Sequence, residues 1–374
     1  MPIRILHTAD NHIGITFRQY PPDIQQRLIK ERFDSLERII NIANQRKAHF
    51  VTISGDLFDK VAVKTEDIRK TVDILSRFEG EAVLVLAGNH DYCEGNESKL
   101  WKVFSQSINN AGIVPLLKPQ AEEFTVDDIT VVFYPCPCPT KYSAEPVIGW
   151  VNDIAKSPEK LHIGLAHGNV EGRALDDNQR YFNMTEEALR AAKVDTWLLG
   201  HIHAPFPEPG STGKPLYFMP GIPTPDSVKV TRPGQAWWIE LELGGNCCYE
   251  PVQTDGIRFV RMKLELQNQG DLQRLKTECA NLDAPNTVLD LIVNGRLSSE
   301  DQELFREFVT EISSCFLHVS VDQEIATLLT PAEIASRFAG GTLPNELLQA
   351  LLADASHPND AHIALEIIES LNNK

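Results

Sequence analysis

Short apolar runs, each followed by a polar cluster, recur along the first two thirds of the chain. The first three lie at residues 3–6, 50–53 and 82–87, and amphipathic stretches with the apolar spacing of a helix separate them. Later runs lie at residues 129–134, 161–166, 196–199, 216–219 and 236–243. This alternation predicts a layered α/β fold. Because ligands of open α/β sheets bind at the carboxyl ends of the strands, the polar clusters are where chemistry is expected.

The polar clusters offer carboxylate, imidazole and amide groups beside glycines that let the backbone turn sharply. Asp10 and His12 are two residues apart, as are His201 and His203, so in an extended segment each pair faces one side. Two divalent ions about 3.5–4 Å apart need roughly seven protein ligands, including a bridging carboxylate. The clusters supply seven candidates, namely Asp10, His12, Asp56, Asn89, His167, His201 and His203.

The seven candidates divide into two ion sites that share one carboxylate. One ion would be held by Asp10, His12 and His203, the other by Asn89, His167 and His201, and Asp56 would bridge them. This mixed set of nitrogen and oxygen ligands suits manganese, iron or zinc better than calcium. His90 is adjacent to Asn89 and is the candidate catalytic residue, because its imidazole could stabilise the transition state or protonate the leaving oxygen.

The composition narrows the class of protein. With 35 basic against 52 acidic residues, the net charge of −17 argues against binding nucleic acid by bulk electrostatic attraction, so any such binding would be local. No run approaches the ~18–20 apolar residues of a membrane span, and no signal-peptide pattern opens the chain, which predicts a cytoplasmic protein without a membrane partner. The seven cysteines are scattered, which indicates reduced thiols rather than a disulfide framework.

In chain order, the motifs Asp-x-His, Gly-Asp-x-x-Asp, Gly-Asn-His-Asp, His and Gly-His-x-His resemble those of the calcineurin-like metallophosphoesterases at every position. The segments His7–Gly14 and Gly55–Asp59 look like the DNA-repair nuclease branch, which includes the SbcD subunit and YhaO-like proteins. The resemblance places the family's metal ligands on the seven residues above, with manganese as the expected metal and His90 as the catalytic histidine. Asn11, where SbcD proteins usually carry Trp, and Lys60–Lys64, where they have a Pro-rich turn, favour the YhaO-like side.

The resemblance also implies a domain organisation that agrees with the chain's own pattern. The segments 244–246 and 251–256 indicate a boundary, after which strand and helix candidates alternate, and from Thr330 the pattern is wholly helical. We predict a layered two-sheet core flanked by helices, a small α+β capping domain and a C-terminal helical segment. The predicted parts are a metallophosphoesterase (nuclease) domain at 1–250, a capping or DNA-binding domain at 251–325 and a helical partner-docking segment at 326–374. A solvated helical appendage is an equally good interpretation of the last part.

The function that the resemblance implies is hydrolysis of DNA phosphodiester bonds, by an exonuclease or endonuclease that works in DNA repair. Hydroxide held between the two ions would attack phosphorus while His90 assists the leaving group. The implied partner besides DNA is an SMC-like ATPase of the SbcC or YhaN kind, which would supply the basic surface that this acidic chain lacks, and a homodimer is possible. Arg173, Arg180 and Tyr181, in the insert after His167, could meet DNA, although ordinary loop residues are as good an interpretation.

Two alternatives stay open. The first is a small-molecule phosphodiesterase or phosphatase with the same metal core, although the roughly 120 residues after the core are not required for a small substrate. The second is a non-catalytic scaffold that binds DNA ends or the ATPase, although a scaffold has no chemical need for seven metal ligands and His90.

Overall fold

The computed structural model describes residues 1–94, 98–109, 112–173, 180–208, 210–230, 232–354, 356 and 360–372. The chain divides into two compact units, Met1–Arg258 and Phe259–Lys374. Among the described residues, no helix combines the length and the apolar character that crossing a bilayer requires.

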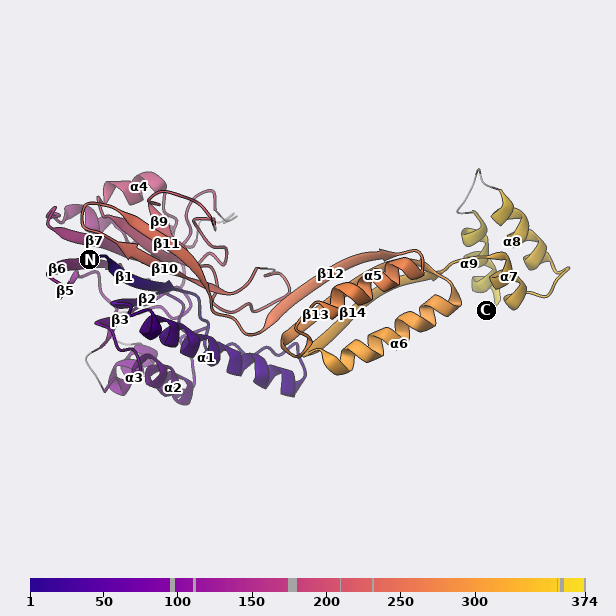
Figure 1. Cartoon of the computed structure of the whole chain (residues 1–374), viewed down its shortest axis with the longest axis horizontal. Helices are drawn as coiled ribbons and strands as arrows, with labels where there is room; N and C mark the ends of the chain where they lie inside the picture. The colour runs from indigo at the N-terminus through magenta and orange to yellow at the C-terminus, as the bar shows by residue number, and fades with distance from the viewer. Residues whose placement is uncertain are drawn as a thin grey trace. The chain divides into compact units, whose positions relative to one another are not determined.

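The first unit contains two mixed sheets (Figure 1). The six-stranded sheet has the order β11-β10-β1-β2-β3-β4 and consists of β1 (Ile3–Thr8), β2 (Phe50–Ser54), β3 (Ala82–Leu86), β4 (Ile113–Leu116), β10 (Gln235–Leu241) and β11 (Cys247–Gln253). The five-stranded sheet has the order β5-β6-β7-β8-β9 and consists of β5 (Glu122–Val126), β6 (Ile129–Cys136), β7 (Lys160–His167), β8 (Thr196–Gly200) and β9 (Tyr217–Phe218). Strands β1–β4 are mutually parallel, as are β6–β9, so their carboxyl ends point the same way within each sheet.

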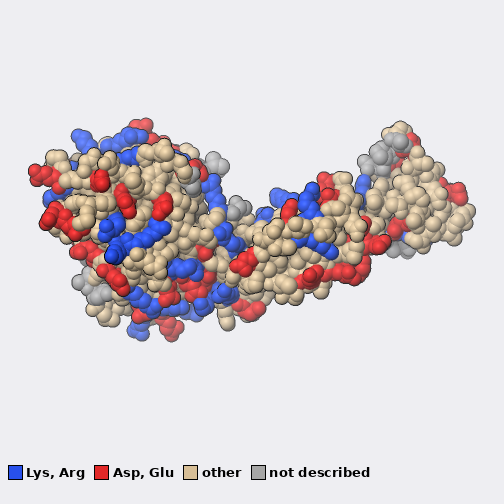
Figure 2. All heavy atoms as spheres, viewed as in Figure 1, with Lys and Arg blue, Asp and Glu red and all other residues tan. Residues whose placement is uncertain are grey.

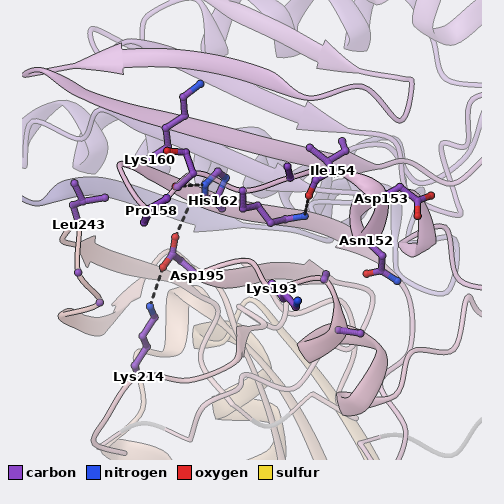
Figure 3. A pocket seen from close by; sticks show the side chains of 17 residues that line it. Asn152, Asp153, Ile154, Pro158, Lys160, His162, Lys193, Asp195, Lys214 and Leu243 are labelled. Atoms are coloured by element: carbon purple, nitrogen blue, oxygen red, sulfur yellow. Dashed lines mark hydrogen bonds and ion pairs between the residues drawn. The ribbon is translucent and has the colours of Figure 1, made fainter.

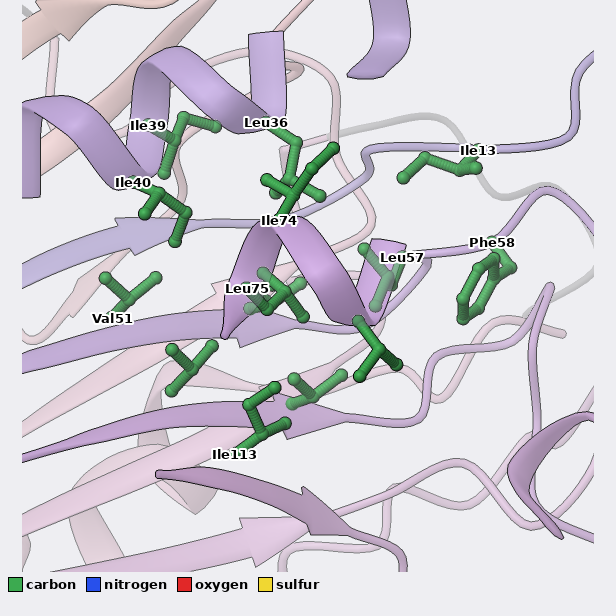
Figure 4. Packing of buried hydrophobic residues seen from close by; sticks show 14 of the residues in the cluster. Ile13, Leu36, Ile39, Ile40, Val51, Leu57, Phe58, Ile74, Leu75 and Ile113 are labelled. Carbon is green, nitrogen blue, oxygen red and sulfur yellow. The ribbon is translucent and has the colours of Figure 1, made fainter. Parts of the chain in front are cut away.

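Helices cover the outer face of each sheet. The six-stranded sheet packs against α1 (Pro22–Gln45), α2 (Thr65–Leu75) and α3 (Lys99–Ser107), whereas α4 (Glu186–Ala191) and the short 3₁₀ helix η1 (Gly149–Asp153) pack on the five-stranded sheet. Figure 4 shows the first of these layers, in which Leu36 and Ile39 of α1 and Leu75 of α2 lie over Val51 of β2. The first unit therefore has four layers in the order helix, sheet, sheet, helix.

Alternate residues of the central strands face different apolar layers. In β1, Leu6 faces the helices and Ile5 faces the second sheet, and in β2 Val51 and Phe50 divide in the same way. A strand buried on both faces needs apolar residues on both, which explains why these segments are unbroken apolar runs. The predicted α/β class, with two sheets, flanking helices and C-terminal helices, is confirmed.

His7, near the end of β1, connects the two sheets. Its Nδ1 lies 3.0 Å from the Thr52 hydroxyl of β2, and its Nε2 lies 3.1 Å from the Leu199 carbonyl oxygen of β8. Because a carbonyl oxygen only accepts, Nε2 carries the proton and Nδ1 accepts from the hydroxyl. Burial of the ring lowers the pKa of His7 from 6.5 to about 4. His7 is thus a neutral link that holds the two sheets together at the end where the polar clusters lie.

We expect His7 to make the protein sensitive to acid. The unfolded chain takes up a proton at His7 below pH 6.5, whereas the folded chain resists protonation until about pH 4, so stability is lost as the pH falls between these values. The part of the loss due to His7 should be about 3 kcal/mol between pH 7 and pH 4. Urea unfolding of the wild type and of His7→Gln at both pH values measures it, and equal losses in the two proteins would show that His7 contributes nothing.

The second unit begins with a three-stranded sheet covered by helices. Its order is β12-β13-β14, with β12 (Arg258–Leu266), β13 (Thr287–Leu297) and β14 (His318–Thr327), and it packs with α5 (Gln269–Ala280), the short 3₁₀ helix η2 (Ala284–Asn286) and α6 (Ser299–Cys315). Three helices follow, namely α7 (Pro331–Arg337), α8 (Leu343–Ala353) and α9 (Asp360–Asn372). They share an apolar cluster that includes Leu329, Ile334 and Leu348. The division of the chain into three functional parts stays a prediction.

Hydroxyl side chains fix the starts of two helices in this unit. Ser298 accepts a hydrogen bond from the Asp301 backbone N–H at the start of α6, and Thr330 accepts one from Glu333 at the start of α7. Such caps satisfy backbone N–H groups that have no partner within the helix. On the face shown in Figure 2, acidic side chains gather along α6, which carries Glu300, Asp301, Glu303, Glu307 and Glu311.

Candidate metal centre

The polar clusters follow strands of both sheets and meet in the first unit. The loop after β1 carries Asp10 and His12, and hydrogen bonds join it to the loop after β2. The Asp10 backbone N–H donates to the Gly55 carbonyl oxygen at 3.1 Å, and the His12 N–H donates to the Asp56 carbonyl oxygen at 3.0 Å. The loop after β8 is joined to the same place, because the His201 backbone N–H donates to an Asp10 carboxylate oxygen at 2.9 Å. Segments far apart in the chain thus form one site.

The candidate ligands adopt an unusual backbone conformation. Asp10, His12, Asp56 and His201 have φ values of 56°, 47°, 52° and 97°. The left-handed region is sterically unfavourable for residues with a Cβ, and such residues persist only where the surrounding structure holds them. Strain of this kind clusters at functional sites, so its presence at four of the seven candidates favours a functional role over simple packing.

All seven candidate ligands come together. In three groups the potential ligand atoms lie within 4.8 Å of one another, namely Asp10/His12/His203, His12/Asp56/His90 and Asp56/His167/His201. Asn89 joins the third group, because its Oδ1 lies 2.9 Å from His167 Nε2 and 3.1 Å from His201 Nδ1. The first and third groups contain the residues predicted for the two ion sites, and Asp56 belongs to the second and third groups. The assignment of individual residues as ligands stays a prediction.

The residues fit a pair of divalent ions. In the part of the chain that the structure describes, both ring nitrogens of His12 and the Asn89 Nδ2 are buried without a hydrogen-bond partner. The carboxylates of Asp10 and Asp56 are also buried. Buried polar atoms without partners cost free energy, and buried charges are expected to be paired or to coordinate metals. Cations at this place would bind a lone pair of His12 and offset the charge of the two carboxylates, whereas Asn89 Nδ2, which is a donor, would need an acceptor.

Electrostatics prepare the histidines to act as ligands. Burial lowers the pKa of His12, His201 and His203, the second to about 3, so these imidazoles are neutral and their lone pairs are available. His167 differs. Burial acts to lower its pKa, but the Asp56 carboxylate, 3.3 Å from Nε2, together with Asp10 and the Ser54 carbonyl oxygen outweighs burial and raises the pKa to about 9. Without metal, the proton on His167 therefore neutralises the charge of Asp56. Binding of a metal would release this proton.

The ring of His90 lies beside the candidate ligands, and its Nδ1 has a partner in the loop after β2. Its Nδ1 lies 2.8 Å from the Asp59 carbonyl oxygen, so Nδ1 donates its proton there. Its backbone N–H donates to Asp56 Oδ1 at 2.9 Å, and its ring centroid lies 4.9 Å from that of His12. The ring is thus fixed beside the candidate ligand groups, and Nε2 is the ring nitrogen left for a further partner.

Asp91 is a supporting residue to which the sequence motif assigned no role. Its buried carboxylate accepts hydrogen bonds from the Phe58 backbone N–H at 3.0 Å and from the Gly88 N–H at 2.7 Å. Phe58 follows Asp56 in the loop after β2, and Gly88 precedes Asn89 in the loop after β3. Asp91 therefore ties two ligand-bearing loops together. Its place in the Gly-Asn-His-Asp motif was the only signal.

Arg32 is a second supporting residue, for which the sequence held no signal. It is an ordinary helical position of α1, yet its guanidinium is buried and donates to the Thr224 carbonyl oxygen at 2.8 Å. Its charge also lies over the Phe17 ring, 5.5 Å from the centroid. Burial lowers its pKa to about 10, so the side chain stays charged at neutral pH. It holds segments that follow the first and last ligand motifs against α1.

We expect Asp91→Asn to weaken both folding and metal binding. The substitution turns one acceptor oxygen into an NH2 group that faces a backbone N–H, which should lower the free energy of unfolding by about 1–3 kcal/mol. The two loops should then hold their ligands less well, and manganese affinity should fall. Urea unfolding and calorimetric titration with manganese measure the two effects. Exposed Asp23→Asn is the matched control, and similar values for both variants would mean that Asp91 does not position the loops.

A model of the calcineurin-like phosphoesterase family matches residues 3–205, which is more than half of the chain. The chain belongs to this family. It is 24% identical over 283 residues to the metallophosphoesterase YhaO of Bacillus subtilis (strain 168), covering 73% of this chain and 65% of YhaO. The match to the DNA double-strand break repair protein Mre11 of Aeropyrum pernix is 23% over 409 residues, or 98% of this chain and 96% of that protein. Mre11 of Methanosarcina acetivorans is 36% identical over 132 residues, which are 34% of this chain and 20% of that protein.

These relatives confirm the predicted family and its DNA-repair branch. Family membership implies phosphoester hydrolysis with divalent metal ions, and the clustered ligand groups agree with it. The chain spans only about two thirds of the length of YhaO, at 65%, and a fifth of the Methanosarcina protein.

Proposed function

We propose that this phosphoesterase is a metal-dependent DNA nuclease. The observation that carries the proposal is the meeting of seven ligand-type side chains in one place, with the fixed ring of His90 beside them. That arrangement occurs in a chain that is similar, over nearly its whole length, to a DNA double-strand break repair protein. The substrate class follows from this similarity, whereas the reaction type follows from the family.

Each group in the centre has a distinct proposed role. Asp10, His12 and His203 would hold one ion, Asn89, His167 and His201 the other, and Asp56 both. When bound, two divalent ions, with manganese as the expected metal, activate water and neutralise the charge that grows on the phosphate. His90 would supply a proton, which the ions cannot. Its Nδ1 is anchored on Asp59, so Nε2 can carry a proton to the departing sugar oxygen.

Aromatic rings beside the centre support a nucleic-acid substrate. The Tyr181 ring lies 4.9 Å from that of His201, and the Tyr142 ring lies 5.6 Å from that of Tyr181. Tyr142 is 49% exposed. Bases of single-stranded DNA stack on exposed aromatic rings, and such stacking tolerates any sequence. We propose that an unpaired nucleotide next to the scissile phosphate rests here.

The decisive experiment is cleavage of end-labelled single- and double-stranded DNA by the full chain with manganese or EDTA. We expect manganese-dependent cutting that Asp56→Asn abolishes, because both ion sites lose the shared carboxylate. His90→Asn should bind manganese normally and cut about 10²–10⁴-fold more slowly. Asparagine keeps a donor for the Asp59 carbonyl oxygen and removes Nε2, so the variant isolates proton transfer from packing. Full activity of His90→Asn would refute its proposed role.

The same assay separates the alternatives. Asp56-dependent hydrolysis of bis(p-nitrophenyl) phosphate without any cutting of DNA, even with the ATPase partner present, would indicate a small-molecule phosphodiesterase. No turnover of either substrate and no bound manganese would indicate a non-catalytic scaffold. Asp23→Asn, on the surface, should behave as the wild type in every arm.

We further propose that the C-terminal helices dock an SMC-like ATPase. Large apolar side chains are exposed here at helical spacing, namely Leu343 and Leu347 on α8 and Ile363, Ile367 and Leu371 on α9, with exposed fractions from 41% to 79%. Residues four apart share one face of a helix, so Ile363, Ile367 and Leu371 form a continuous stripe. A stripe of this kind is typical of a helix that binds a partner. A homodimer and a cytoplasmic location stay predictions.

Co-purification of the coexpressed SMC-like ATPase with the full chain tests the docking proposal. We expect the double variant Ile363→Ser/Ile367→Ser to lose the ATPase and to keep its manganese-dependent activity, because the metal centre lies in the first unit. Glu366→Ser is the matched control, since Glu366 is exposed on the same helix. Deletion of residues 330–374 should have the effect of the double variant. Retention of the ATPase by the deleted chain would disprove docking at these helices.

A further inference from the structure

A pocket of about 900 Å³ lies at the amino ends of β7 and β8 (Figure 3). Residues 152–162, 191–195 and 243–245, together with Lys214, line it. His167 and His201 lie at or just beyond the opposite ends of the same two strands, roughly 23 Å away for seven residues of an extended strand. The pocket is therefore separate from the metal centre.

Four lysines line this pocket in a chain whose net charge is −17, and two of them are neutralised. Lys160 Nζ lies 2.9 Å from a carboxylate oxygen of Glu123, and Lys214 Nζ lies 3.4 Å from Asp195. The other oxygen of Asp195 accepts a hydrogen bond from the His162 backbone N–H at 2.9 Å (Figure 3). Each oxygen of Asp195 thus already has a partner.

The other two lysines, Lys156 and Lys193, have no carboxylate within ion-pair distance in the described ranges. Lys156 is held in place, since its Nζ donates to the Val151 and Ile154 carbonyl oxygens and lies 5.0 Å from the centroid of the Tyr134 ring. Burial, and then the charge of Lys193, lower the pKa of Lys156. Both lysines line the same pocket, so their positive charges repel each other, and an anion between them would relieve the repulsion.

Two apolar side chains also line the pocket. Leu243 is 43% exposed, and both Leu243 and Pro158 line the wall away from Lys193 (Figure 3). The volume lies within the range of about 300–1,000 Å³ that is typical of small-molecule sites. A ligand that contacts both the lysines and the apolar side chains would carry a compact anionic group at one end and a flat or apolar group at the other.

We propose that this pocket binds a phosphorylated small molecule of the nucleotide class, with the phosphate on Lys156 and Lys193 and the base against Pro158 and Leu243. The site requires no metal and does not depend on the proposed nuclease activity. Its ligand would join the segment before β7, the turn between α4 and β8 and the hairpin turn between β10 and β11.

Calorimetric titration of the full chain with adenosine 5′-monophosphate in EDTA tests this site, because EDTA prevents phosphate from binding through metal ions. The key variant is Lys193→Asn. Lys193 has φ of 53°, and Asn adopts this left-handed conformation more readily than most residues, so the charge is removed without strain. Lys47→Asn is a matched control, since Lys47 is an exposed lysine with φ of 55° outside the pocket.

We expect the nucleotide to bind the wild type and Lys47→Asn equally, and Lys193→Asn about tenfold more weakly. Lys193→Asp, which reverses the charge, should weaken binding further. Adenosine, without a phosphate, and inorganic phosphate, without a base, should each bind at least tenfold more weakly than the nucleotide. No binding by the wild type, or equal binding by Lys193→Asn, would overturn the site. Equal affinity for inorganic phosphate and the nucleotide would overturn the nucleotide class.

Discussion

The carboxylate of Asp56 is the group on which the arrangement of the metal centre depends. One of its oxygens accepts the His90 backbone N–H at 2.9 Å, and the other lies 3.3 Å from His167 Nε2 and 3.9 Å from His12 Nε2. His90 and His12 lie in the loops after β3 and β1, and His167 is the last residue of β7, so both sheets contribute partners. A single buried charge therefore orders loops that no local interaction would bring together. Asp56 follows β2, which lies between β1 and β3 in the first sheet, so it is within reach of the loops that follow both neighbours.

Close approach of these loops requires residues without side chains at two points. A Cβ on Gly88 would lie 2.2 Å from Asp56 Oδ1, and a Cβ on Gly55 would lie 2.2 Å from His167 Nδ1. Real Cβ atoms do not come so near another atom, so any larger residue would push the carboxylate or the imidazole aside. Gly55 in addition has φ of 89°, which favours glycine. The glycines of the Gly-Asp and Gly-Asn-His-Asp motifs are thus needed for the same reason as the ligands beside them.

The side chains that the sequence singled out meet in one place because they belong to short motifs at the ends of apolar runs, in a fixed chain order. The sequence predicted the core strands because burial on both faces leaves an unbroken apolar run. Two edge strands could not be predicted in this way. Strand β5 has the sequence Glu-Glu-Phe-Thr-Val with no fully buried residue, and β4 contains Pro115, so neither resembles a buried strand. Arg32 could not be found either, because a helical arginine is ordinarily solvated and only the tertiary structure buries it.

The acidic charge of the chain is compatible with a phosphodiester substrate because attraction at the centre would not come from lysines. Two buried carboxylates, Asp10 and Asp56, offset only part of the charge of two divalent ions, and the histidine ligands other than His167 are neutral. With His167 deprotonated on binding metal, the loaded centre would therefore be positive in a protein whose surface mixes both signs of charge (Figure 2). Binding of phosphate would then be local and would depend on the metal, whereas a basic surface would bind nucleic acid anywhere along its length. The lysine pocket at the other end of β7 and β8 would attract phosphate differently, because its positive charge comes from side chains and needs no bound ion.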